Sequence, residues 1–135
     1  MFGKKAKVEL LKQVPLFAEC SKRELAYIAE VSDEMDFPAG HTLIEEGKLG
    51  REFFVIADGT VEVRRGGKKI QQRGDLHSFG EMALLNETPR NATVTTASPV
   101  RGLVITGRAF RQLLVDVPSV GPKLLATLAA RVDPS

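Results

Sequence analysis

The middle of the chain is divided into short apolar segments by turn residues, and this pattern limits the fold more than any other feature. Val61 and Val63 alternate with charged residues, as expected of a half-buried strand. The pair Gly66-Gly67 follows them, and two glycines permit the positive φ angles of a two-residue hairpin turn. We therefore predict about seven short strands. Besides the two strands of this hairpin, they cover residues 42–45, 53–57, 92–96 and 100–105.

Helical spacing borders this centre on both sides. Val8 and Leu11 predict a first helix, and Ser21 with Glu24 forms a capping-box pattern that predicts the start of a second. Near the other end of the chain, Phe110 begins an apolar stripe at helical spacing. This order of elements predicts a single α+β domain over residues 1–135. It divides into helices at about 5–13 and 21–33, a strand region at about 36–106 and closing helices at about 107–133.

Composition excludes several classes of protein. Hydrophobic residues make up 43% of the 135 residues, which is ordinary for a globular domain, and the net charge of +2 indicates no strong field for nucleic acids. Cys20 is the only cysteine, so an internal disulfide is excluded. No apolar run reaches membrane-spanning length. With no catalytic triad pattern, metal cluster or phosphate-binding loop of the GxxxxGK type, we expect a non-enzymatic, cytoplasmic protein.

The segment from residue 79 to residue 94 contains the residues best suited to chemistry. Gly80 allows the backbone to approach a ligand closely, and the good helix formers after it predict a turn whose free amides favour an anion. Arg90 could clamp phosphate oxygens, and Glu81 could accept hydrogen bonds from a sugar hydroxyl. Alternatively, Arg90 pairs with Glu87 at the surface and Glu81 merely favours a helix N-terminus. Spacing alone leaves both readings open.

The same segment resembles the phosphate-binding cassette of the cyclic nucleotide-binding domain family, written F-G-E-x-A-L-(several)-P-R-x-A-x-V. The matching residues are Phe79, Gly80, Glu81, Ala83, Leu84, Pro89, Arg90, Ala92 and Val94. The resemblance continues along the whole chain, from Val14-Pro15-Leu16-Phe17 to the closing helices. It implies a jelly-roll-like antiparallel β-roll of about seven to eight strands, flanked by N-terminal and C-terminal helices.

The resemblance also implies a role for individual residues. Glu81 would accept the ribose 2'-hydroxyl, with the backbone of Gly80 beside it. Arg90 would pair with the negative charge of the cyclic phosphate. The amides of Ala83 and Ala92 would complete the phosphate cradle.

Five further positions are implied as ligand-binding. Val63 and Ile70 match positions near the base, although plain core packing explains them too. Met82 belongs to the cassette, and Asn91 follows its arginine. Because Asn91 lacks the hydroxyl that can favour guanine, we predict a preference for cAMP over cGMP. Arg131 matches a position that reaches the ligand in some members, the alternative being a helix-end arginine that complements the helix dipole.

The function that the resemblance implies is a non-catalytic sensor or regulatory module. Its ligand would be cAMP, with cGMP as second candidate, and no cofactor or metal is expected. The implied partner is another protein or an output domain, with no nucleic-acid-binding motif and no membrane segment. The alternative is the same fold used as a protein-interaction module or as a module that binds a cyclic dinucleotide.

Overall fold

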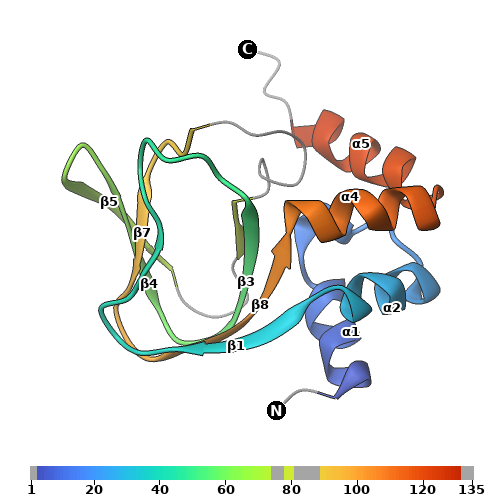
Figure 1. The fold of residues 1–135 in the computed structure, drawn as a ribbon, viewed down its shortest axis with the longest axis horizontal. Helices are drawn as coiled ribbons and strands as arrows, with labels where there is room; N and C mark the ends of the chain where they lie inside the picture. The colour runs from blue at the N-terminus through green and yellow to red at the C-terminus, as the bar shows by residue number, and fades with distance from the viewer. Residues whose placement is uncertain (1–2, 74–77, 81–88, 132–135) are drawn as a thin grey trace.

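The computed structural model describes residues 3–73, 78–80 and 89–131, with helices towards both ends and eight strands between them (Figure 1). The helices are α1 (Lys4–Lys12), the short 3₁₀ helix η1 (Pro15–Phe17), α2 (Lys22–Glu30), α4 (Gly107–Asp116) and α5 (Val120–Arg131). The strands are β1 (Asp33–Phe37), β2 (Thr42–Ile44), β3 (Glu52–Asp58), β4 (Val61–Arg65), β5 (Lys68–Arg73), β6 (Ser78–Phe79), β7 (Thr93–Thr96) and β8 (Val100–Thr106).

The strands form two four-stranded sheets, in the orders β1-β8-β3-β6 and β2-β7-β4-β5. The strand pairs are antiparallel. Figure 1 shows the helices on one side of the two sheets and the β4–β5 hairpin on the opposite side. The predicted antiparallel β-roll with flanking helices is therefore confirmed.

Strand β3 forms a wall between two hydrophobic cores. Phe53 and Val55 pack into the core under the helices, whereas Phe54 and Ile56 pack into the core between the sheets. Side chains of a strand alternate between its faces, so four consecutive apolar residues supply both cores. This explains why the segment at 53–57 is apolar without interruption.

Three phenylalanines form the centre of the core under the helices. The ring of Phe17 from η1 lies 6.0 Å from that of Phe53 on β3 and 6.4 Å from that of Phe110 on α4. Each of the three side chains is fully buried. This contact joins the N-terminal helices, the first sheet and the closing helices.

The end of helix α2 differs from the prediction. We expected the helix to reach about residue 33 and the strands to begin at about 36, but α2 ends at Glu30 and β1 begins at Asp33. The hydroxyl of Ser32 donates to the carbonyl oxygens of Ile28 and Ala29, which ends the helix. Strand β1 is mainly polar and lies at a sheet edge, so it shows no apolar alternation.

Two local predictions are confirmed. The Ser21 hydroxyl accepts from the Glu24 amide at 3.1 Å and the Glu24 carboxylate accepts from the Ser21 amide at 2.7 Å, which completes the capping box. Gly66 and Gly67 form the turn of the β4–β5 hairpin with φ angles of 61° and 81°.

Candidate functional site

Arg90 is the centre of the candidate site. It lies just before β7, is half-buried, and its Nη2 donates to the carbonyl oxygen of Glu52 at 2.6 Å. Glu52 is the first residue of β3, so the guanidinium is fixed against the wall shared by the two cores. Among the described residues, no other hydrogen bond uses the guanidinium, whose remaining N–H donors suit the oxygens of a ligand.

Two glycines make room for the Arg90 side chain. A Cβ atom at Gly50 would lie 2.8 Å from Arg90 Cδ, and one at Gly80 would lie 2.7 Å from Arg90 Nη1. Gly80 also has a φ of 86°, which favours glycine for conformational reasons. Gly80 and Arg90, ten positions apart in the predicted cassette, are therefore brought into contact.

The backbone around Arg90 is held by the loop that joins β2 to β3. The Arg90 amide donates to the Lys48 carbonyl at 2.7 Å, and the Arg90 carbonyl accepts from the Gly47 amide at 2.8 Å. Pro89 forms an isolated antiparallel bridge with Leu49. These contacts fix the position of the backbone from which the guanidinium extends.

The residues after Arg90 face the β4–β5 hairpin. The carbonyl oxygen of Asn91 accepts from Arg65 Nε at 2.9 Å, while the rest of Asn91 is exposed. Ala92 is buried, with 7% of its surface exposed. The segment 90–92 therefore lies between a loop on one side and a hairpin on the other.

The electrostatics of the site favour an anion. Partial burial lowers the pKa of Arg90, and the neighbouring Glu52 carboxylate opposes this by raising it. Arginine stays charged at neutral pH despite such a shift. A half-buried guanidinium of this kind can form paired hydrogen bonds to the oxygens of a phosphate or carboxylate.

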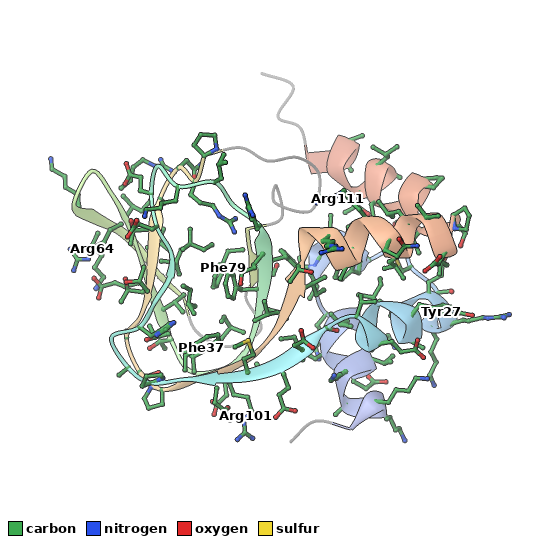
Figure 2. All side chains as sticks on the ribbon, in the orientation of Figure 1. Tyr27, Phe37, Arg64, Phe79, Arg101 and Arg111 are labelled. Atoms are coloured by element: carbon green, nitrogen blue, oxygen red, sulfur yellow. The ribbon has the colours of Figure 1, made fainter. Side chains whose placement is uncertain are left out.

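Val63 and Ile70, predicted near a base, differ in their surroundings. Val63 is half-buried and packs against the core between the sheets. Ile70 on β5 is 49% exposed, which is unusual for an isoleucine in a strand. Figure 2 shows Phe37 and Phe79 directed into the space between the sheets, where they line the same core.

Several predicted site residues lie outside the described part of the chain. These are Glu81, Met82 and Ala83; the side chain of Arg131, at the end of α5, is likewise not described. The predicted helical turn after Gly80 falls in the same range.

Gly50 and the carbonyl of Glu52 were missed as parts of the site. Gly50 matched no predicted site position, and Glu52 belonged to no motif. The sequence did contain a signal, because Gly50 is a second glycine only three residues after Gly47 in the same loop. The contact with Arg90 joins positions forty residues apart, which a local motif does not report.

Among the described residues, no group of three or more histidine, cysteine, aspartate or glutamate side chains could hold a metal ion. Of the helices so described, none has the length and apolar character that crossing a membrane requires.

Comparison with known proteins identifies similar domains. A family model described as "Cyclic nucleotide-binding domain" matches residues 34–116. A cAMP-dependent protein kinase regulatory subunit of Mycosarcoma maydis is 38% identical over 117 residues, which cover 78% of this chain and 22% of the relative. A CRP-like cAMP-activated global transcriptional regulator of Mycobacterium tuberculosis is 28% identical over 129 residues, which cover 92% of this chain and 58% of the relative.

A solved structure shows the same architecture. The N-terminal domain of a transcriptional regulator from Streptomyces coelicolor superposes with a TM-score of 0.84 at 28% identity, covering 90% of this chain and 91% of that domain. By contrast, the chain spans only 22% and 58% of the two sequence relatives described above. The likeness is therefore to one domain of those longer proteins.

Proposed function

Because the chain belongs to the cyclic nucleotide-binding domain family, we propose that it binds cAMP and reports its presence without catalysing a reaction. The observation that carries this proposal is the position of Arg90. Its guanidinium is half-buried, lies against Gly50 and Gly80, and is held by the Glu52 carbonyl. A guanidinium that is fixed before the ligand arrives loses little side-chain freedom on binding, which favours affinity.

The proposed contacts are those that the resemblance of residues 79–94 to the cassette implies. Arg90 pairs with the cyclic phosphate, and the amide of Ala92 donates to a phosphate oxygen. Glu81 accepts the ribose 2'-hydroxyl beside the backbone of Gly80. The Ala83 amide completes the cradle, and Met82 lies within the same segment.

The base would lie toward the β4–β5 hairpin. Val63, Ile70 and Asn91 are the proposed contacts, and Arg131 is proposed to reach the ligand from the end of α5. The 49% exposure of Ile70 supports this assignment, because an apolar side chain left open on a strand can be covered by an adenine.

The proposed output is a protein surface. We propose that residues 1–135 fold as one domain, that it works in the cytoplasm, and that its ligand-dependent state is read by a protein partner. The two relatives are named as a kinase regulatory subunit and a transcriptional regulator, and both names describe regulation.

The experiment is calorimetric titration of the protein, freed of bound nucleotide, with cAMP, cGMP and a cyclic dinucleotide. We expect cAMP to bind most tightly. Arg90→Ala should weaken binding by about 2 to 5 kcal/mol, because one partner of a buried charge pair is removed. Arg64→Ala is the control, since Arg64 has the same charge, is 48% exposed and pairs with Glu62.

Three outcomes would contradict the proposal. Undetectable binding at millimolar cAMP would exclude the ligand class. Tighter binding of cGMP would reverse the base preference. Preferred binding of the cyclic dinucleotide would favour the alternative use of the fold.

A further inference from the structure

A second group of arginines lines a cavity beside the candidate site. The cavity has a volume of about 630 Å³ and lies between the residues that begin β3 and the first turns of α4. Three arginines line it, namely Arg51, Arg108 and Arg111. Glu52 is the one acidic residue in the described lining, which Gly50, Thr106 and Gly107 complete. Three positive charges against one negative charge favour an anion in this cavity.

Backbone contacts fix the two segments that carry these arginines. The amide of Gly107 donates to the carbonyl of Arg51 at 2.8 Å, and Glu52 on β3 lies opposite Thr106 on β8. Arg108 is the second residue of α4, and Arg111 follows three positions later. Residues three apart lie on the same face of a helix, which explains why both line the cavity.

The positive charge of these arginines is not neutralised within the described part of the chain. All three are exposed, and none of their guanidinium groups forms a hydrogen bond or ion pair with another described residue. The first turn of α4 contains no acidic residue, although the helix dipole disfavours cations there. By contrast, Lys4 at the start of α1 pairs with Glu30. The arginines of the cavity are therefore suited to an external anion.

The cavity is distinct from the space around Arg90. Of the residues described in the cassette, which are 79–80 and 89–94, none belongs to its lining. The two spaces share a wall, because Glu52 lines the cavity while its carbonyl accepts from Arg90 at 2.6 Å. Figure 2 shows Arg111 on the half of α4 that lies nearer the sheets. An anion in the cavity would thus be bound by arginines other than Arg90.

The size and charge of the cavity indicate which anion fits. Its volume of about 630 Å³ lies within the range of about 300 to 1,000 Å³ that is common for small-molecule sites. A guanidinium binds phosphate oxygens through two parallel hydrogen bonds. Three guanidinium groups offer more paired contacts than a single phosphate or carboxylate needs. Two linked phosphates match this number of donors and this excess of positive charge better.

We propose that the cavity lined by Arg51, Arg108 and Arg111 is a second ligand site, which takes a small molecule that carries a pyrophosphate group, such as a nucleoside diphosphate. The inference goes beyond the proposed function and does not depend on the binding of cAMP. It assigns a task to three arginines outside the cassette motif.

The first test locates the binding of pyrophosphate on the wild-type protein by NMR. Titration with pyrophosphate should shift the backbone amide and side-chain Nε–H signals of Arg51, Arg108 and Arg111. The signals of Arg23 should shift clearly less. Arg23 is the matched control, because it is exposed and is the second residue of α2, as Arg108 is of α4. The shifts should persist when cAMP is present in excess.

The second test measures the affinity for pyrophosphate by calorimetry. Arg108→Ala and Arg111→Ala should each weaken binding about tenfold, because each removes a charge-assisted contact. Arg23→Ala should stay within about twofold of the wild type. Arg111→Lys keeps the charge but not the planar fork, so it should recover only part of the loss. Melting temperatures of the ligand-free variants should agree, because all of these side chains are exposed.

Four results would overturn the inference. The absence of any shift at millimolar pyrophosphate would exclude the site. Shifts confined to residues around Arg90 would assign pyrophosphate to the nucleotide site. Equal losses in Arg23→Ala and Arg108→Ala would reduce binding to general charge. Tighter binding of a glutamate-rich peptide than of pyrophosphate would indicate a protein-docking surface instead. Failure of the wild type to bind cAMP would overturn only the proposed function, since pyrophosphate is titrated without it.

Discussion

The two ends of the molecule differ in the kinds of residue that form them. The helical end consists of the five described helices and the residues of β3 and β8 that pack on them, and it is filled with apolar side chains such as Phe17, Phe53 and Phe110. The site end consists of the β2–β3 loop, the β4–β5 hairpin, Gly80 and residues 89–92. It contains a half-buried arginine, two glycines that make room for it, and like-charged pairs at a turn. The helical end therefore stabilises the fold, whereas the site end contains features that destabilise the fold locally.

The largest effect is expected at the helical end. Phe17→Ala removes a fully buried ring that contacts both Phe53 and Phe110, and should cost about 3 to 5 kcal/mol of unfolding free energy. Denaturant unfolding measures it. The matched control is Val115→Ala on α4, where 71% of the side chain is exposed and about 0.5 kcal/mol or less is expected. Similar losses in the two variants would refute the assignment of stability to this core.

One exception to the apolar character of the helical end is a buried carboxylate. Glu24 is 5% exposed, and besides capping α2 it accepts hydrogen bonds from Ser119 and from Lys123 of α5. Burial alone would raise the pKa of Glu24. The hydrogen bonds from Lys123, Ser119 and Ser21 lower it by a larger amount, so that the pKa falls to about 2. The carboxylate joins the N-terminal helices to the start of the closing helix.

This exception predicts a dependence on acid. The folded pKa lies below the ordinary value of 4.5, so the stabilisation is complete above about pH 4.5 and is lost as the pH falls toward 2. Glu24→Gln should cost about 1 to 3 kcal/mol at neutral pH, and less as the pH approaches 2. Unfolding curves at several pH values test this, with the exposed Glu9→Gln as control. A difference that does not change with pH would contradict the prediction.

At the site end, Gly50→Ala should affect binding more than folding. The added Cβ meets Arg90 Cδ at 2.8 Å and displaces the guanidinium from the Glu52 carbonyl. We expect cAMP affinity to fall about tenfold, which corresponds to about 1.4 kcal/mol. Gly121→Ala is the control, because a Cβ there meets nothing within 4 Å. Unchanged affinity in Gly50→Ala would show that Arg90 needs no such space.

The smallest effect is expected from a substitution at the site end that should stabilise the fold and weaken cAMP binding. Lys68→Glu turns the pair with Arg65 from like to opposite charge, and should stabilise the fold by about 0.2 to 1 kcal/mol. The new carboxylate also competes with the Asn91 carbonyl for Arg65, so affinity for cAMP should decrease. Thermal unfolding and titration measure the two effects, with the exposed Lys5→Glu as control. A gain in both stability and affinity would contradict the expected effect of the hairpin charges on cAMP binding.

Sequence reasoning succeeded where a local pattern carries the information. Apolar periodicity located the helices and most of the strands, and the Gly66-Gly67 pair fixed one hairpin. It failed at β1, because that strand lies at a sheet edge and its mainly polar residues show no alternation. The contacts of Gly50 with Arg90 and of Arg65 with Asn91 were also missed, since each joins segments that are distant in sequence and near in space.

Strand β3 has a consequence for the tolerance of this chain to mutation. An ordinary amphipathic strand leaves every second position facing water, and those positions accept most residues. Residues 53–56 have no such position, because alternate side chains enter separate cores. A library randomised at 53–56 should therefore yield far fewer folded proteins than one randomised at 33–36 in the largely exposed strand β1. Variation among natural homologues should avoid β3 in the same way, on both of its faces.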